Sequence, residues 1–271
     1  MASFHCLTFL TDYGLEDGFV AVCHGISSRI APDVRIIDIT HLVPPGDIRR
    51  GAAVLAQTVP YFPPAVHLAV VDPGVGTTRR AVAVAAGGSV FVGPDNGLLS
   101  WAVEAAGGAT AAVSLTNRSL WLDAATATFH GRDIFMPVAA RLAAGTVTLA
   151  EAGEELATGS LVVLARPVSH VRDGTAEAEV VTVDRFGNVQ LSVSEADAAR
   201  AGIVPGAPVT LACRGQEHTM PFGTTFGDVA PGELIGYIDS ARLVAIAVNG
   251  GDAARQLGLS PGTRVTVRVA E

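Results

Sequence analysis

The chain has 271 residues, 49% of them hydrophobic and 16% charged, which is enough for one large domain or two smaller ones. Its net charge of −8 argues against a nucleic-acid or anionic-membrane partner, and no apolar run approaches the roughly 18 residues of a membrane span. All 18 basic residues are arginine, which excludes a Schiff-base lysine and a P-loop lysine. The N-terminus lacks the cationic region of a signal peptide, and three scattered cysteines fit buried thiols, so we expect a cytoplasmic protein.

Strand and helix signals alternate through the first part of the chain. Residues 6–10, 34–40 and 67–72 form predicted strands, and residues 17–30 and 48–59 form the predicted helices between them. This rhythm predicts a parallel sheet with helices on its faces. The further elements expected are a hairpin of 81–86 with 89–92, a helix at 97–106, a strand at 111–115 and a helix at 133–144.

The character of the sequence changes after about Pro167. Short strands separated by Gly-rich turns are expected at 177–184, 189–193, 208–213, 218–222, 234–239, 243–248 and 264–269. That spacing predicts a small antiparallel barrel or sandwich. The expected fold class is therefore α/β, with an N-terminal α/β domain over 1–165, a mainly parallel central sheet, and a smaller antiparallel C-terminal domain over 175–271.

Polar residues gather where the predicted parallel strands end. Asp12 follows the first strand, residues 38–41 close the second, and Asp72 closes the third. Ligands of open parallel sheets bind beyond the carboxyl ends of the strands. One aspartate in such a place is more often a turn or a helix cap, but several at successive strand ends favour a site.

Two loops carry further candidate chemistry. Asp72 opens a segment with two glycines that ends in Arg79 and Arg80, and either arginine could fold back toward Asp72. A tight loop with two solvated arginines explains these residues equally well. His130 stands beside Gly131 just ahead of a predicted helix, and although a lone histidine is usually structural, the glycine favours a ligand contact.

The second half of the chain offers candidate binding residues in its turns. Residues 183–189 read as a hairpin with its bend at Phe-Gly-Asn. Phe222 and Phe226 lie in a Gly-rich loop, where they either stack on a flat ligand or pack into the core. Ser240 and Asn249 add polar groups at strand ends.

In this order and spacing, the motifs resemble the family of S-adenosyl-L-methionine (SAM) hydroxide adenosyltransferases, relatives of the SAM-dependent fluorinase and chlorinase. The motifs are Leu-Thr-Asp12-Tyr-Gly, Ile-Ile-Asp-Ile-Thr-His41, Val-Val-Asp72-Pro-Gly-Val-Gly-Thr, Val-Gly-Pro-Asp95-Asn-Gly-Leu, Thr-Phe-His130-Gly-Arg-Asp, Asp184-Arg-Phe-Gly-Asn188, Thr-Phe226-Gly-Asp and Ala-Val-Asn249-Gly-Gly. The resemblance implies a C-terminal β-barrel and a homotrimer, with substrate held between one subunit's N-terminal domain and a neighbour's barrel.

The resemblance also implies a role for each matched position. Asp72, Arg79 and His130 match the catalytic trio of the hydrolases, and Asp12 would hold the ribose hydroxyls. The other implied substrate contacts are Asp17, Asp184 and Ser240 at the methionine end, Phe186, Asn188, Phe226 and the Val248 backbone around adenine, and Asn249 beside them. No metal and no cofactor is implied, because SAM is the substrate.

A few positions separate the chain from the halogenating relatives. Those relatives carry Tyr in place of Asp72, and the fluorinase carries Ser in place of Gly131. Gly46 and Gln190 stand where aromatic residues occur in the relatives, which leaves the fit around the methionine end open.

The predicted reaction is hydrolysis of SAM to adenosine and L-methionine, by substitution at the ribose 5′ carbon with water-derived hydroxide. Asp72 and His130 would orient the water and take its proton while Arg79 favours the charged forms; which of the two is the base stays open. Two alternatives are a halogenase of the same fold, which a fixed carboxylate at Asp72 disfavours, and a non-catalytic SAM- or adenosine-binding protein, which would have no use for the trio.

Overall fold

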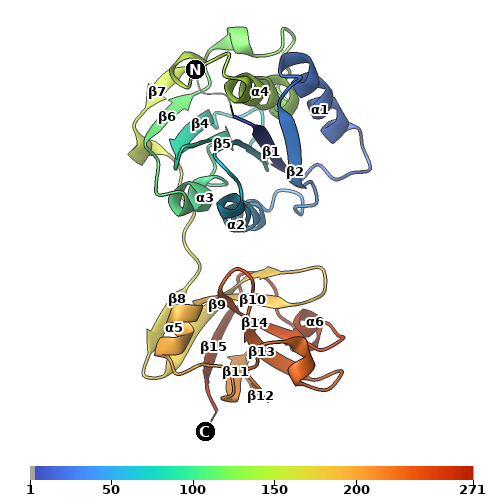
Figure 1. The fold of residues 1–271 in the computed structure, drawn as a ribbon, viewed down its shortest axis with the longest axis vertical. Coiled ribbons are helices and arrows are strands. Elements are labelled where there is room, and N and C mark those ends of the chain that lie inside the picture. Colours follow the sequence, from blue (N-terminus) through green and yellow to red (C-terminus); the bar gives the residue numbers. More distant parts are fainter. Residues whose placement is uncertain (1–3, 271) are drawn as a thin grey trace. The chain divides into compact units, whose positions relative to one another are not determined.

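The computed structural model describes residues 4–270. It divides into two compact units, one ending at Leu164 and the other beginning at Ala165 (Figure 1).

The first unit is built around a seven-stranded mixed sheet with the order β2-β1-β3-β5-β4-β6-β7. Its strands are β1 (Cys6–Thr11), β2 (Arg35–Thr40), β3 (Val66–Val70), β4 (Ala81–Ala86), β5 (Ser89–Pro94), β6 (Ala111–Ser114) and β7 (Glu154–Leu156). The pairs from β2 to β5 are parallel, and the pairs of β4 with β5, β4 with β6 and β6 with β7 are antiparallel. Only β4 and β7 therefore run against the rest, which confirms the prediction of a mainly parallel sheet.

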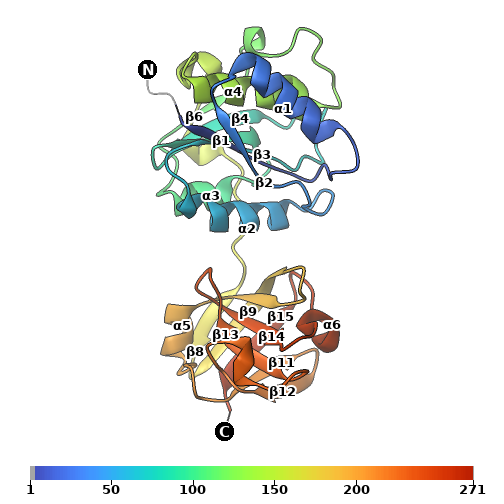
Figure 2. The ribbon, with the colours of Figure 1, turned by 45° about the vertical axis from the view of Figure 1, so that its right-hand side comes forward.

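Helices cover both faces of this sheet. They are α1 (Phe19–Ile30), α2 (Ile48–Thr58), α3 (Ser100–Ala105) and α4 (Met136–Ala144), with short turns of helix η1 (Val59–Tyr61), η2 (Arg118–Leu120), η3 (Gly131–Phe135), η4 (Ala150–Ala152) and η5 (Thr158–Ser160). In both views α1 and α4 lie on one face, and α2 and α3 on the other (Figures 1 and 2). Strands β1 and β3 are buried along their whole length, as a sheet covered on both faces requires.

The connections place a topological switch point between β1 and β3. The chain leaves β1 through α1 to reach β2, then passes through α2 to reach β3 on the other side of β1. These two helices cover opposite faces, so the crevice between their strands opens at the carboxyl ends, where Thr11 pairs with Val70. Ligands of open sheets bind at such a point. Asp12 and Asp72 are the acidic residues that follow the two strands.

The second unit is an antiparallel, barrel-like sheet. Its strands are β8 (Ser169–Arg172), β9 (Thr175–Val183), β10 (Val189–Ser194), β11 (Val209–Cys213), β12 (Gln216–Met220), β13 (Leu234–Ile238), β14 (Leu243–Val248) and β15 (Arg264–Val269), and its helices are α5 (Glu195–Arg200), η6 (Phe226–Asp228) and α6 (Ala253–Leu257). The order is β12-β11-β15-β9-β10-β14-β13, with β8 beside β9. Phe222, just past β12, forms a bridge with Gly236 of β13, which brings the two ends of that order together. The predicted β-barrel is confirmed.

Some elements differ from their predicted bounds. Helix α1 begins at Phe19, which leaves Asp17 in the preceding loop. A π-helical turn, η3, starts directly after His130, where an ordinary helix was expected only from Asp133. Strands β7 and β8 and helices α5 and α6 were not predicted; each has six residues or fewer, too few for a periodic pattern. Within residues 4–270, none of the helices is long and apolar enough to cross a membrane.

Candidate active site

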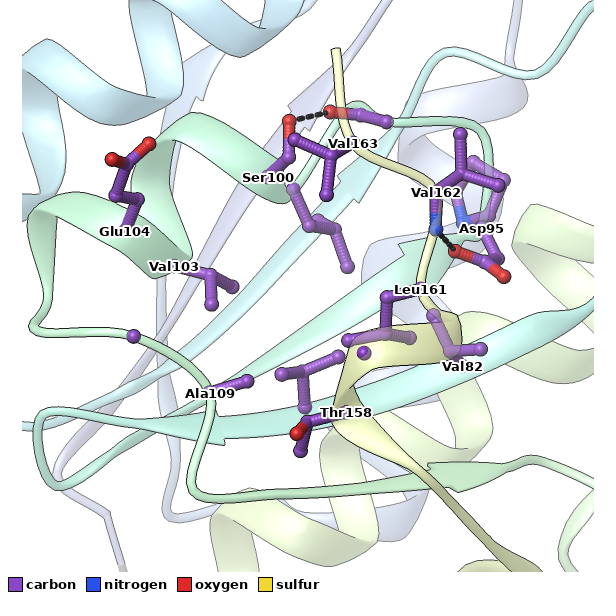
Figure 3. Close-up of a pocket in the computed structure, with 16 residues that line it drawn as sticks. Val82, Asp95, Ser100, Val103, Glu104, Ala109, Thr158, Leu161, Val162 and Val163 are labelled. Carbon is purple, nitrogen blue, oxygen red and sulfur yellow. Dashed lines mark hydrogen bonds between the residues drawn. The ribbon is translucent and has the colours of Figure 1, made fainter.

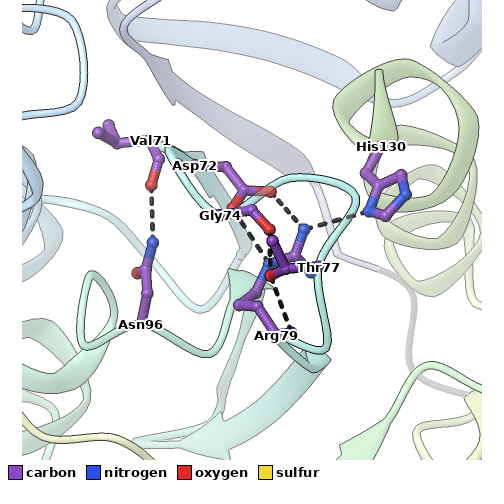
Figure 4. A network of polar contacts seen from close by, with 7 residues as sticks. All are labelled: Val71, Asp72, Gly74, Thr77, Arg79, Asn96 and His130. Carbon is purple, nitrogen blue, oxygen red and sulfur yellow. Dashed lines mark hydrogen bonds and ion pairs between the residues drawn. The ribbon is translucent and has the colours of Figure 1, made fainter. Parts of the chain in front are cut away.

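The loop after β3 folds Arg79 back onto Asp72. The backbone N–H of Val75 donates to the Asp72 carbonyl at 3.2 Å, and the Thr77 hydroxyl donates to the Gly74 carbonyl at 2.7 Å. Thr77 Oγ1 in turn accepts from the Arg79 N–H at 3.3 Å. These turns bring Arg79 back beside Asp72, seven positions earlier in the chain, as Figure 4 shows.

Asp72, Arg79 and His130 form one hydrogen-bonded group. Arg79 Nε donates to Asp72 Oδ1 at 3.1 Å, and Nη2 pairs with Asp72 Oδ2, so the contact is a two-pronged ion pair. The same Nη2 lies 3.1 Å from Nδ1 of His130 (Figure 4). The Asp72 and Arg79 side chains are only 6% and 8% exposed, so water screens the pair weakly. The structure thus brings together the three residues expected to be catalytic.

The loop that carries His130 is anchored from both sides. Gly76 has φ of +78°, and a Cβ there would come within 2.7 Å of the Ala127 carbonyl, so only glycine allows the two loops this close. Buried Asp133 accepts from the backbone and hydroxyl of Thr126 at 2.8 Å each and from Arg132 Nε at 2.6 Å. Burial acts to raise the pKa of Asp133, but these hydrogen bonds outweigh it and hold the pKa below its usual range. His130 is therefore positioned by its surroundings.

The surroundings of His130 define which of its ring nitrogens carries the proton. Burial, and then the neighbouring Arg79 cation, lower the pKa of His130 despite the opposing effect of the acidic groups, so the ring is neutral near pH 7. A guanidinium nitrogen can only donate, so Nδ1 accepts from Arg79 and the ring proton sits on Nε2. His130 thus presents an N–H donor on its outer edge.

Arg79 has a hydrogen-bond donor that is not used by the other residues of the trio. Its second terminal nitrogen, Nη1, is buried and has no hydrogen-bond partner within the described part of the chain. The guanidinium carbon lies 5.3 Å from the centre of the Phe135 ring, which holds the group in place. Because an unmet buried donor is costly, this nitrogen suits an oxygen ligand such as water or hydroxide.

Arg80, the alternative partner, points elsewhere. Its Nε donates to Asp95 Oδ2 at 2.8 Å, and its other nitrogens reach Ser160. Arg80 therefore joins β4 to the segment near the end of the first unit, and Arg79 is the arginine of the trio.

Tyr13 is a residue of this region to which the sequence analysis gave no role. Its hydroxyl occupies the space beside Gly131: a Cβ at position 131 would lie 1.8 Å from that oxygen. The Tyr13 ring packs edge-on against Phe129 and Phe19. Burial, followed by the charges of Cys23, Asp12 and Asp72, raises its pKa well above the usual value, so the phenol stays protonated. Tyr13 directly follows Asp12 in the Leu-Thr-Asp-Tyr-Gly motif, and that position was the sequence signal that could have pointed to it.

Asp12 lies between β1 and the loop of Gly46. Its Oδ2 accepts from the Gly46 N–H at 2.8 Å. Gly46 has φ of +73°, a conformation in which a side chain would be strained, which explains a glycine at this position in the chain. Asp17 is exposed in the loop before α1. The structure thus places Asp12 against a fixed backbone turn and leaves Asp17 at the surface.

In the second unit, Asp184 organises the hairpin between β9 and β10. Its Oδ1 accepts from the backbone of Phe186 at 2.8 Å and of Asn188 at 2.9 Å, while Oδ2 accepts from the Asn188 side chain at 2.8 Å. The predicted bend is present. It leaves the Phe186 ring 72% exposed.

The two phenylalanines of the Gly-rich loop have opposite environments. Phe222 is 1% exposed and belongs to the core, whereas Phe226 is 43% exposed and lies edge-on to Tyr237 at 5.2 Å. Phe226 is therefore the one available for a ligand. Val248 is buried at the end of β14, and the Asn249 side chain donates to the Val229 carbonyl at 2.8 Å.

Ser240 is exposed beside a turn that Gln190 supports. Gln190 Nε2 donates to Asp239 Oδ2 at 2.6 Å, and Asp239 Oδ1 accepts from the backbone of Leu243 at 3.0 Å. Gln190 thus holds the turn that displays Ser240.

Two pockets of the first unit differ in character. One of about 510 Å³ lies beside His130, with Thr126 and Trp121 in its lining. The other, of about 420 Å³, is mostly apolar and includes none of the predicted site residues (Figure 3). Its Asp95 and Ser100 accept from the backbones of Val162 and Leu164 at 2.9 and 3.2 Å, so its polar groups serve the fold.

Models of known protein families match both units of the chain. Models for the N-terminal and C-terminal domains of SAM hydroxide adenosyltransferases match residues 7–153 and 178–266. The chain belongs to the SAM hydroxide adenosyltransferase family. The family resemblance is confirmed.

Individual relatives extend this result over nearly the whole chain. An (R)-S-adenosyl-L-methionine hydrolase of Salinispora tropica is 57% identical over 98% of this chain and 99% of its own, and one of Thermus thermophilus is 40% identical over 95% and 97%. A fluorinase of an Actinoplanes species is 29% identical over 97% of both chains. A solved structure of a conserved Thermotoga maritima protein has a TM-score of 0.92 and 37% identity, covering 97% of this chain and 99% of that one.

Proposed function

We propose that this member of the SAM hydroxide adenosyltransferase family is an (R)-S-adenosyl-L-methionine hydrolase. The observation that carries the proposal is the buried group of Asp72, Arg79 and His130, in which Arg79 keeps an unpartnered nitrogen. A carboxylate, a spare guanidinium donor and an imidazole N–H are suited to holding one water molecule. The names of the similar hydrolases support SAM as the substrate.

The reaction needs no covalent enzyme intermediate. The water oxygen forms a bond to the ribose 5′ carbon while the bond from that carbon to the sulfonium breaks. Its electron pair goes to sulfur, which releases neutral L-methionine thioether and leaves adenosine with a new 5′ hydroxyl. One proton of the water must be removed, and alignment opposite sulfur supplies much of the remaining acceleration.

We assign the proton acceptor to Asp72. His130 uses its Nδ1 lone pair on Arg79 and carries its proton on Nε2, so it can orient the water as a donor but cannot take a proton at that edge. The Asp72 oxygens retain lone pairs after pairing with Arg79. Arg79 stabilises the negative charge that develops on the water oxygen.

The same group disfavours halide chemistry. The Asp72 carboxylate would repel a fluoride or chloride ion at the position of the nucleophile. Tyr13 also fills the space beside Gly131, the position for which the family resemblance implies a serine in the fluorinase. Both features point to water as the nucleophile.

Substrate contacts would come from both units of the chain. Asp12 follows β1 at the switch point and suits the ribose hydroxyls, with Asp17 toward the methionine end. Phe186 and Phe226 are exposed aromatic rings suited to stacking on adenine. The remaining proposed contacts of the second unit are Asp184, Asn188, Ser240, Val248 and Asn249.

We also infer a homotrimer, with the site completed by a neighbouring subunit, and a cytoplasmic location. The first inference rests on the membership of the chain in the SAM hydroxide adenosyltransferase family. Three free, buried cysteines support the second, because reduced thiols are typical of that compartment.

Product analysis tests the function directly. Purified protein incubated with SAM should release adenosine and methionine in equal amounts, with or without added chloride or fluoride. A 5′-halogenated adenosine in the presence of halide would favour a halogenase. Intact SAM together with tight binding by calorimetry would favour a binding protein.

A further inference from the structure

A second cluster of polar side chains lies apart from the trio, on α1 and at the end of β2. Nε2 of His24 is 2.9 Å from Asp38 Oδ1, and Nε2 of His41 is 3.1 Å from the same oxygen. The three potential ligand atoms all lie within 4.8 Å of one another. We propose that His24, Asp38 and His41 bind one divalent transition-metal ion of the zinc class.

His41 provides the main reason to prefer an ion to hydrogen bonding alone. Its side chain is buried, with the residue 4% exposed, and within residues 4–270 its Nε2 makes no hydrogen bond of good geometry, although Asp38 Oδ1 lies 3.1 Å away. A buried polar atom in this state is costly. A cation between the imidazole nitrogen and the carboxylate would satisfy both atoms.

The surroundings of His41 favour its metal-binding form. Nδ1 lies 2.9 Å from Thr11 Oγ1, and in the tautomer with the proton on Nδ1 the hydroxyl oxygen accepts it, which leaves the Nε2 lone pair facing the cluster. Hydrogen bonds of this kind orient metal-binding histidines. The Phe9 ring packs edge-on at 4.8 Å and limits ring rotation.

The ligand types select the class of ion. Two imidazole nitrogens and one carboxylate oxygen suit zinc and similar first-row ions, whereas Mg²⁺ and Ca²⁺ prefer all-oxygen sites. Asp38 and His24 are partly exposed, so water can complete the coordination.

An ion here would brace the segment that carries Asp12. The His41 carbonyl accepts from the Gly14 N–H at 2.8 Å, and its ring contacts Thr11, directly before Asp12. The ion would therefore lock the end of β2 to the loop after β1. We assign it a structural role, with no part in the chemical step of the proposed hydrolysis.

Cobalt binding gives a direct test. Protein freed of metal with a chelator is titrated with Co²⁺, and visible absorption bands of a nitrogen- and oxygen-coordinated ion should appear and saturate at one ion per chain. Zn²⁺ should displace the cobalt and raise the melting temperature. His24→Asn and Asp38→Asn should each weaken binding by about tenfold or more. His170→Asn, which changes an exposed histidine of β8, is the matched control and should bind normally.

Absence of the bands, or equal binding by His24→Asn and the wild type, would overturn the proposal. A thermal shift that survives in the His24→Asn, Asp38→Asn double variant would also overturn it. SAM turnover of the metal-free protein is measured separately, so failure of the metal site is distinguishable from failure of the proposed function.

Discussion

The candidate residues of the two units are held in different ways. In the first unit, Asp72 and Arg79 are nearly buried, pair with each other and contact His130 through one nitrogen. In the second unit, Phe186 and Phe226 project from turns that are themselves firmly hydrogen-bonded, and their rings are exposed. The difference indicates that the groups proposed for chemistry are preorganised, whereas those proposed for binding are displayed for a ligand to cover. Substitutions in the trio should therefore affect turnover or stability, and those of the two exposed rings should affect affinity.

The largest expected effect is the loss of turnover in Asp72→Asn. The variant removes the proposed proton acceptor and the charge that pairs with Arg79, so kcat should fall by about 10²–10⁴-fold. The Kd for SAM, measured by calorimetry, should change by less than about tenfold, or about 1.4 kcal/mol.

The matched control is Asp95→Asn. It breaks the analogous ion pair with Arg80, so it should lower stability while leaving kcat largely intact. Equal losses of kcat in the two variants would show that the trio has no special role.

The stability of the first unit is also expected to be sensitive to acid. Burial lowers the pKa of His67, which lies in β3 against Thr8, to about 4. Between its ordinary value near 6.5 and about 4, the unfolded chain takes up a proton that the folded chain refuses, so stability falls as the pH drops. Over this pH range, the free energy of unfolding should fall by about 3 kcal/mol.

Urea unfolding near pH 7 and near pH 4 measures this effect. His67→Gln should flatten the pH dependence relative to the wild type, and the exposed-site variant His170→Gln should not. An unchanged slope in His67→Gln would exclude His67 as its source.

Gly131→Ala tests the close contact beneath His130. The new Cβ would meet the Tyr13 hydroxyl, so the free energy of unfolding should fall by about 2 kcal/mol. Tyr13→Phe removes that oxygen, and the double variant should regain part of the loss. Simple additivity in this double-mutant cycle would contradict the contact.

Phe186→Ala should have the smallest effect, on affinity alone. Loss of a stacking ring would raise the KM for SAM by about tenfold, within the usual 1–3 kcal/mol range for stacking on a base, with kcat nearly unchanged. Tyr61→Ala changes an equally exposed ring of the first unit and should leave KM alone. A fall in kcat with constant KM would contradict a binding role.

Much of this organisation could be predicted from the order of apolar segments. The alternation of strands and helices predicted the mainly parallel sheet, and the regular short strands predicted the antiparallel unit. The sequence did not predict the short elements or the local geometry. Helix α5 has six residues with its cap at Ser194, and the π-helical turn after His130 departs from the 3.6-residue period.

The candidate site shows the same division. Asp72 and His130 stood out at a strand end and beside a glycine, but the sequence could not distinguish Arg79 from Arg80, because adjacent residues in an extended segment point in opposite directions. The cluster of His24, Asp38 and His41 matches no metal motif, since its members come from a helix and a neighbouring strand end. Only the fold brings them together.

In the proposed reaction, the buried trio activates water for attack at the 5′ carbon of SAM. The most direct measurement is turnover in heavy-oxygen water, with mass spectrometry of both products. One heavy oxygen should appear in the 5′ hydroxyl of adenosine and none in methionine, and the signal should be nearly lost in Asp72→Asn. Unchanged SAM, or adenosine without the label, would contradict the proposed reaction.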